Sequence, residues 1–255
     1  MAEKVRADEL LLAQGFAQSR EQAKRLIMAG QAYIKQGADW MRIDKPGRPL
    51  PREVAIFVKE SERFVSRGGY KLLTAIEKFS IQVKDKVCLD VGASTGGFTD
   101  CLLQFGAARV YALDVGYGQL HWKLRGHEQV VNLEKVNIRM ARPDLLPEQV
   151  DLLVIDCSFI SLTRVLPGAL PFLKLGGEAV VLVKPQFEVG PGRTVKGIVK
   201  SHDLAMETVE RVISGSVRDF DLEYKGMVPS MIKGPKGNQE YLVWFRKNKP
   251  RKADG

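Results

Sequence analysis

The sequence predicts an α/β protein in which a doubly wound, mostly parallel sheet follows a small α+β domain. From about Arg67 onward, short apolar runs alternate with stretches of helical periodicity, the pattern of parallel strands joined by crossover helices. Before that point the chain carries only short helical and strand-like runs, and these end in the polar stretch 59–63. We therefore expect a first domain over 1–59, a linker over 60–66, a sheet domain over 67–246 and a basic tail over 247–255.

The composition is that of a globular chain with an excess of positive charge. Lys and Arg number 39 and Asp and Glu number 30, so the net charge is +9 and the isoelectric point is about 9.4. A surface of this charge favours polyanions, which makes nucleic acid and an anionic membrane both candidate partners. No apolar run approaches the roughly 20 residues that cross a bilayer, and the first residues are too charged for a secretion signal. We expect a cytoplasmic protein that does not associate with membranes.

The three cysteines, Cys88, Cys101 and Cys157, show no C-x-x-C spacing, and two of them lie within apolar runs. This pattern is typical of buried free thiols in a reducing compartment rather than of disulfides or a zinc site. We accordingly expect no required metal.

The first domain is predicted to hold two short helices followed by short strands. One helix is expected over 7–13, and a second begins at Ser19, where Gln22 completes a capping-box arrangement. The second helix has a cationic face that could neutralise phosphates, although such a face can also be merely solvated. Strands are expected at 32–35, 41–43 and 54–58. The candidate nucleic-acid contacts are Arg6, Ser19, Arg20, Lys24, Arg25, Lys35 and Arg67.

The run R-A-D-E-L-L-L-A-Q-G-F-A-Q-S-R-E-Q-A-K-R-L-I-M-A-G-Q-A-Y-I resembles a small RNA-binding domain first described in a ribosomal small-subunit protein. The same domain occurs in pseudouridine synthases and tyrosyl-tRNA synthetases, and its S-R-x-x-A-K-x-L-I-x-x-G core is fairly specific. One departure is Gln36-Gly37, where such domains often carry Asn-Gly. The resemblance implies that this domain binds structured RNA.

A Gly-rich turn lies between the first strand and the next helix of the sheet domain. The run 87–100 reads V-C-L-D-V-G-A-S-T-G-G-F-T-D. Glycines let the backbone approach a ligand closely, and the helix that follows offers free N–H donors. Asp114 ends the next strand 22 residues after Gly92, where a doubly wound fold presents an acid to a ribose diol.

The spacing within this turn discriminates between nucleoside ligands. A dinucleotide site would need G-x-G-x-x-G, whereas this turn reads D-x-G-x-x-x-G-G with an acid at Asp90. An acid there repels a pyrophosphate but suits the ammonium of a methionine moiety, so we predict S-adenosyl-L-methionine over a nicotinamide cofactor or a structural turn. Asn137, on the polar loop after the third strand, is a candidate adenine contact or an ordinary turn residue. The candidate cofactor-binding residues are Asp90, Gly92, Ala93, Ser94, Gly96, Gly97, Phe98, Asp114 and Asn137.

Charged residues end two further apolar strands, at the edge where open α/β folds bind ligands. Asp156 follows V-D-L-L-V-I, and Lys184 follows A-V-V-L-V. Opposite charges on neighbouring strand ends form a candidate reactive pair. Lys71 opens the helix before the first strand and Glu240 begins the last apolar run, so the four residues occur in the order K-D-K-E.

This order resembles the catalytic tetrad of RNA ribose 2′-O-methyltransferases of the FtsJ type. With the N-terminal domain in front, nearly the whole chain resembles the TlyA family, sometimes called hemolysin A. The motifs that carry the resemblance are S-R-G-G-Y-K-L, D-V-G-A-S-T-G-G-F-T-D, D-C-S-F-I-S-L and V-K-P-Q-F-E. Because family members methylate cytidine riboses in ribosomal RNA, the resemblance implies a Rossmann-like methyltransferase sheet, S-adenosyl-L-methionine as cofactor and ribosomal RNA or ribosomal subunits as partners.

The chemistry of a ribose hydroxyl agrees with that tetrad. The hydroxyl is a poor acid, so the protein must align it with the methyl donor and help its proton leave. We expect Lys184 to hold or deprotonate the hydroxyl and both Asp156 and Glu240 to orient Lys184. Lys71 would add positive charge that favours neutral Lys184, or it would bind phosphate.

Three other functions stay open at this stage. A base amino-methyltransferase would carry D/N-P-P-Y/F after the fourth strand, and 156–159 has the ends of that motif without its prolines. A second possibility is a binding protein that keeps the cofactor fold without catalysis. A lytic protein, as the hemolysin name suggests, would need a long amphipathic helix, and none is evident. Phe159 is expected either in the core or stacked on a flipped base.

Overall fold

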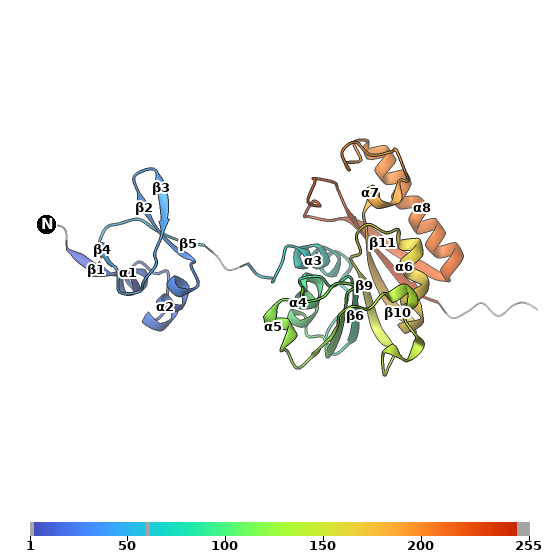
Figure 1. Cartoon of the computed structure of the whole chain (residues 1–255), viewed down its shortest axis with the longest axis horizontal. Helices are drawn as coiled ribbons and strands as arrows, with labels where there is room; N and C mark the ends of the chain where they lie inside the picture. Colours follow the sequence, from blue (N-terminus) through green and yellow to red (C-terminus); the bar gives the residue numbers. More distant parts are fainter. Residues whose placement is uncertain (1–2, 60–61, 249–255) are drawn as a thin grey trace, which may run out of the picture. The chain divides into compact units, whose positions relative to one another are not determined.

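The computed structural model describes residues 3–59 and 62–248, and the chain divides into two units, Met1–Arg63 and Phe64–Gly255 (Figure 1). The described part of the first unit contains two helices and five short strands. Their bounds are β1 Lys4–Arg6, α1 Ala7–Ala13, α2 Arg20–Met28, β2 Ala32–Gln36, β3 Asp39–Arg42, β4 Pro49–Pro51 and β5 Ile56–Val58.

The helices of the first unit share a small core with one face of an antiparallel sheet of order β3-β2-β5. Leu10 and Leu11 of α1 and Ile27 of α2 cluster there with Ile34 of β2. The α2 cap differs slightly from a capping box. Ser19 Oγ accepts a hydrogen bond from the Gln22 backbone N–H at 3.2 Å, but the Gln22 side chain accepts from the residue before the cap rather than from the cap itself.

The second unit is built on a seven-stranded sheet of order β11-β12-β10-β9-β6-β7-β8. The five strands from β10 to β8 pair in parallel, and β12 is antiparallel to both β10 and β11. The predicted α/β doubly wound class is therefore confirmed. Its elements are α3 Gly68–Phe79, β6 Val87–Val91, α4 Gly97–Gln104, β7 Arg109–Leu113, α5 Trp122–Arg125, β8 Val130–Leu133, η1 Ile138–Met140, η2 Pro143–Leu145, β9 Val150–Ile155, α6 Leu162–Ala169, η3 Leu170–Phe172, β10 Leu173–Val183, α7 Pro185–Glu188, α8 His202–Phe220, β11 Leu222–Pro229 and β12 Tyr241–Lys247.

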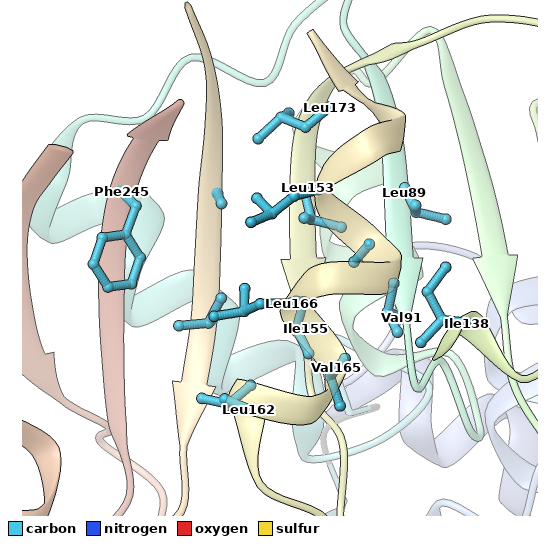
Figure 2. Packing of buried hydrophobic residues seen from close by; sticks show 14 of the residues in the cluster. Leu89, Val91, Ile138, Leu153, Ile155, Leu162, Val165, Leu166, Leu173 and Phe245 are labelled. Carbon is cyan, nitrogen blue, oxygen red and sulfur yellow. The ribbon is translucent and has the colours of Figure 1, made fainter. Parts of the chain in front are cut away.

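Helices cover both faces of this sheet. Successive residues of a strand point to opposite sides, so each face has its own set of side chains that pack against the helices. On one face, Leu72 of α3 and Leu102 of α4 cluster with Val154 of β9. On the other face, α6 and α8 pack over alternate residues of the same strands, and Figure 2 shows Leu166 of α6 next to Ile155 of β9. Two apolar clusters thus hold the sheet rigid up to its carboxyl edge.

The strand order places a topological switch point between β6 and β9. From β6 the chain winds outward through β7 and β8, and then returns to β9 on the other side of β6. In open α/β sheets the crevice for a ligand lies outside the carboxyl ends of the strands at such a point. The Gly-rich turn leaves β6 there, and Asp156 follows β9 at the same edge.

The start of the second unit includes part of the stretch predicted to be a linker. Phe64 is 2% exposed and packs in the cluster of α3 and α4. The Val65 backbone N–H donates to Asp100 Oδ2 at 2.7 Å. A β-carbon on Gly69 would lie 2.3 Å from the Phe64 ring, so this glycine makes room for the ring. Residues 64–66 therefore pack with the sheet unit. Residues 60–61 and 249–255 of the predicted linker and tail lie outside the described residues.

Candidate active site

A cleft of about 540 Å³ opens at the carboxyl edge of the second unit's sheet. Its walls come from the start of α3, the Gly-rich turn, the ends of β9 and β10, and the loop before β12. This volume is within the range of small-molecule sites. The lining carries five cations and two carboxylates, an excess of positive charge that suits a polyanion. These seven charged residues are Arg67, Lys71, Lys184, Lys233, Lys236, Asp156 and Glu240.

Lys184 and Asp156 form an ion pair on the floor of this cleft. Lys184 Nζ lies 2.6 Å from Asp156 Oδ1, and the two side chains are 8% and 19% exposed. The angles of this contact are poor, so Asp156 Oδ1 has no hydrogen-bond partner among the described residues. Lys184 Nζ donates its hydrogen bond to Ser158 Oγ at 2.7 Å. The ammonium is thus held from two sides by groups that follow β9.

Lys71 and Glu240 form a second, more deeply buried pair in the same cleft. Lys71 Nζ donates to Glu240 Oε2 at 2.6 Å, and the Glu240 side chain is 1% exposed. Glu240 Oε1 accepts a hydrogen bond from Gln186 Nε2 at 3.2 Å. We expected Glu240 to orient Lys184, but the structure pairs it with Lys71, because β12 brings Glu240 toward the first turn of α3. The four tetrad residues therefore meet in one cleft as two separate ion pairs.

The glycines of the turn are required by its packing against neighbouring protein atoms. Gly92 has φ +86°, and a β-carbon there would lie 2.7 Å from the Asp156 carbonyl oxygen. Gly96 has φ +94°, and its β-carbon would collide with Leu124. A β-carbon on Gly97 would lie 2.8 Å from the backbone nitrogen of Gly69 at the start of α3. Gly92, Ala93, Ser94, Gly97 and Phe98 line the cleft, whereas Gly96 lies behind them.

Asp90 lies under the turn and is completely buried. Thr99 Oγ1 donates to Asp90 Oδ2 at 2.7 Å, while Oδ1 has no partner among the described residues. Burial, together with the nearby carboxylates of Asp156 and Asp114 and against the hydrogen bonds from Thr99, raises the pKa of Asp90 to about 7. An orphaned acidic oxygen below a ligand cradle is the group that a bound ammonium would satisfy.

A small closed hollow, without room for a water molecule, lies on the other side of the turn, between the ends of β7 and β8. It is lined by Ala93 and Ser94, which the main cleft shares, and by Asp114, Asn132 and Glu134. Asp114 accepts hydrogen bonds from the backbone N–H groups of Ser94 at 2.8 Å and Gly116 at 2.7 Å. A backbone hydrogen bond from Gly118 lowers the pKa of Glu134 below its ordinary value.

Asn137 is not among the residues that line the cleft or the hollow. Its Oδ1 accepts from the Arg139 backbone N–H at 3.2 Å and caps η1, which is the ordinary turn role. Asn132 and Glu134, near the end of β8, are closer to where an adenine contact was expected. Asn137 as an adenine contact therefore stays a prediction.

Phe159 stands at the mouth of the cleft and is 89% exposed. The prediction that it could be a core residue is therefore wrong. Its backbone has φ +64°, an uncommon conformation for a bulky residue. Its ring lies 5.0 Å from the Phe187 ring, centroid to centroid. An exposed aromatic held in a left-handed conformation beside a reactive pair is a candidate ligand platform.

Several cations of the first unit that we predicted to contact nucleic acid are already paired. Arg6 and Arg20 both donate to Asp8, and Lys24 donates to Glu21 at 2.7 Å. The Arg6 guanidinium holds the pKa of Asp8 below its ordinary value. Ser19 is engaged as the α2 cap. Arg25 and Lys35 form no ion pair among the described residues, and Arg67 lies in the second unit, in the cleft wall.

The cleft also contains residues that the sequence analysis missed. Ser158 bonds Lys184, Gln186 bonds Glu240, and Lys233 and Lys236 add charge from the loop before β12. Ser158 and Gln186 each lie two residues beyond a selected strand-end charge, so their position was a usable signal. In residues 3–59 and 62–248, no group of three or more His, Cys, Asp or Glu side chains could hold a metal ion, and no helix is long and apolar enough to cross a membrane.

The fold and the cleft define the class of protein. Its members have a doubly wound sheet, with a Gly-rich turn and a lysine–carboxylate pair at the switch point of that sheet. The O-methyltransferase of Bacillus cereus, solved in complex with SAH, shares the fold with a TM-score of 0.50 and 15% identity, over 73% of this chain and 84% of that one. The model of the FtsJ-like methyltransferase family matches residues 64–247.

The chain belongs to the FtsJ-like methyltransferase family and, within it, to the TlyA or hemolysin A group, as the sequence predicted. The 16S/23S rRNA (cytidine-2′-O)-methyltransferase TlyA of Mycobacterium tuberculosis is 43% identical over 249 residues, which cover 96% of this chain and 91% of the relative. A solved Streptococcus thermophilus protein, named as a candidate hemolysin, superposes with a TM-score of 0.72 at 41% identity, over 98% of this chain and 90% of that one.

Proposed function

We propose that this protein transfers a methyl group from S-adenosyl-L-methionine to the ribose 2′-hydroxyl of cytidine in ribosomal RNA. The observation that carries the proposal is the Lys184–Asp156 ion pair, 2.6 Å apart, on the floor of a cleft bounded by the Gly-rich turn. The name of the M. tuberculosis relative, with which the chain shares 43% identity, supports the same reaction and substrate.

The lysine–carboxylate pair suits an attack by a weakly acidic hydroxyl. In its neutral form, Lys184 Nζ would hold the 2′-hydroxyl and take its proton as the oxygen bonds the methyl group and the bond from that methyl group to sulfur breaks. Asp156 would then stabilise the ammonium that results. Ser158 Oγ keeps Lys184 pointed at the cleft by accepting its hydrogen bond at 2.7 Å. Glu240 and Lys71 contribute differently, because their buried pair joins the start of α3 to β12 and places a cation in the cleft wall.

The residues around the turn fit the methyl donor. Asp90 Oδ1, buried without a partner, would meet an ammonium group, and the backbone at 92–97 would cradle the rest of the amino-acid portion. Asp114 and Glu134 lie beside the turn and are the acids that would face the ribose hydroxyls of the nucleoside portion. The cofactor, when bound, supplies a methyl group on a sulfonium that is already a strong electrophile.

The rim of the cleft fits an RNA strand with its target nucleotide turned in. Arg67 donates to the Lys233 carbonyl at 3.2 Å, so two cations stand together where a phosphate would pass. Phe159, exposed beside Lys184, would stack on the base of the turned-in nucleotide. In this proposal, the cations position the strand and the aromatic ring holds the base.

The decisive experiment uses ribosomal subunits from cells that lack the enzyme, radiolabelled S-adenosyl-L-methionine and nuclease digestion of the RNA. We expect label in 2′-O-methylcytidine with wild-type protein and none with Lys184→Ala. Lys174→Ala is the matched control, because Lys174 forms a 2.6 Å ion pair with Asp151 outside the cleft. Label on a base amine would replace the proposal with a base amino-methyltransferase. Cofactor binding without transfer to any subunit would favour a binding protein.

A further inference from the structure

The sheet of the first unit has one face that its helices leave uncovered. Ala32, Ile34 and Ile56 point into the helical core, so the alternate residues Tyr33 and Phe57 point the other way. The strand register adds three more residues to this outer face. Arg42 lies opposite Tyr33, and Trp40 lies opposite Lys35. We call this set the outer sheet face: Tyr33, Lys35, Trp40, Arg42 and Phe57.

The aromatic residues of the outer sheet face form one connected group. Trp40 and Phe57 come from the two edge strands, β3 and β5, yet their ring centroids are only 5.6 Å apart. The Tyr33 ring lies 6.2 Å from the Phe57 ring. Trp40 and Phe57 remain 47% and 46% exposed, so half of each side chain faces solvent. The domain thus holds a continuous π surface that it does not use for its own core.

The charges on this face are positive and unpaired. Neither Lys35 nor Arg42 forms an ion pair among the described residues, and the face carries no carboxylate. The cationic face of α2 differs in this respect, since Arg20 is bonded to Asp8 and Lys24 to Glu21. A phosphate that meets the outer sheet face competes with no internal carboxylate, whereas at α2 it must displace one.

We infer that the outer sheet face binds an unpaired segment of the RNA substrate, with bases stacked on Trp40 and Phe57 and phosphates on Lys35 and Arg42. Aromatic rings alternating with cations are the surface that single strands prefer, because every base has a π face and every linkage a charge. A duplex keeps its bases stacked internally and offers this surface only phosphates. The inference rests on the proposed function for the identity of the substrate.

The test measures binding and needs no methyl transfer. The full-length protein is titrated with an unstructured oligoribonucleotide of about ten nucleotides, a length that spans one such domain, and with a duplex of the same length. We expect the single strand to quench tryptophan fluorescence in the wild type. Trp40→Phe should retain the affinity and lose that part of the quench, and Trp40→Ala should weaken binding about tenfold, as expected for one stacked base.

Controls separate this inference from folding and from the proposed function. Tyr224→Ala removes another half-exposed aromatic, from β11 of the second unit, and should leave binding unchanged. Circular dichroism checks that the Trp40 variants fold. If Trp40→Ala does not fold, Arg42→Ala tests the same face independently and should also lose affinity. Equal affinity of wild type, Trp40→Ala and Arg42→Ala, or duplex binding equal to single-strand binding, would overturn the inference. In that case the proposed function would be unaffected, because methyl transfer by these variants is measured separately. Failure of transfer in the wild type, in contrast, would refute the proposed function alone.

Discussion

Gly92 and Asp156 meet so closely that a β-carbon on Gly92 would lie 2.7 Å from the Asp156 carbonyl oxygen. Gly92 belongs to the turn that would hold the cofactor, and Asp156 belongs to the ion pair that would act on the hydroxyl. The two parts of the site therefore pack directly against each other across the switch point, where the Asp156 N–H also donates to the Val91 carbonyl at 3.0 Å. A shift of either part moves the other.

Substitution of Gly92 should accordingly damage both stability and cofactor binding. In Gly92→Ala the new methyl meets a backbone oxygen that cannot give way easily, and φ +86° is strained for alanine. We expect a loss of more than about 2 kcal/mol in the free energy of unfolding, measured with denaturant, together with weaker cofactor binding by calorimetry. Gly192→Ala, at φ +74° with no atom within 4 Å, tests strain alone and should cost about 1 kcal/mol. Equal losses in the two variants would show that the contact is unimportant.

Removal of the Lys184 amino group should abolish transfer and spare cofactor binding. Lys184→Ala and Asp156→Asn are expected to lower the single-turnover rate by at least about a hundredfold, the usual contribution of a positioned proton acceptor. The cofactor dissociation constant should change little, because Lys184 is bonded to Asp156 and Ser158 and, among the described residues, to none of the Gly-rich turn. A proportional loss of both quantities would mean that Lys184 acts by supporting the turn.

The Lys71–Glu240 pair should contribute more to stability than its surface counterparts. Because Glu240 is 1% exposed, Glu240→Ala leaves a buried ammonium without its counter-ion and should cost about 3 kcal/mol in the free energy of unfolding. The double variant Lys71→Met/Glu240→Leu should cost less than the sum of its single changes. Arg142→Ala breaks an exposed pair and should have no measurable effect. Additive losses would argue against a coupled pair.

The strand ends were the part of the site that could be predicted, because a charge that closes an apolar run must emerge at the sheet edge. Asp156 and Lys184 were found in this way. The partner of Glu240 could not be, since it depends on β12 entering the sheet antiparallel between β10 and β11. That arrangement is a long-range pairing with no local sequence signal. The exposure of Phe159 likewise depends on a left-handed backbone that its residue type disfavours.

For the fold, too, the elements with a local sequence signal could be predicted and the others could not. The parallel strands were predictable from their short apolar runs, and the α2 cap from Ser19 and Gln22. The β1–β4 ladder was missed, because each strand has three residues and β4 begins and ends with proline. The β10 strand begins at Leu173, earlier than expected, because Gly176 and Gly177 lie in a bulged region that no apolar run marks.

Phe159 should affect transfer without affecting folding. Its side chain is 89% exposed, so Phe159→Ala should leave the thermal unfolding midpoint unchanged. If the ring stacks on the target base, that variant should raise the KM for ribosomal RNA about tenfold, and Phe159→Tyr should restore it. Met140→Ala removes another highly exposed apolar side chain and is the control. Unchanged kinetics in Phe159→Ala would remove the stacking role from the proposed function.

The buried carboxyl of Asp90 makes the stability of the cofactor-free protein depend on pH. Burial raises its folded-state pKa to about 7, whereas in the unfolded chain it titrates near 4. The folded state therefore keeps this proton over a range in which the unfolded state has lost it, and stability must fall as pH rises from about 4 to about 7. Asp90→Asn removes the titration and keeps the shape. Between about pH 5 and pH 8 the wild type should lose about 3 kcal/mol more than the variant in the free energy of unfolding. Parallel curves for the two proteins would mean that Asp90 is ionised in the folded state, with a counter-charge or solvent that satisfies its Oδ1.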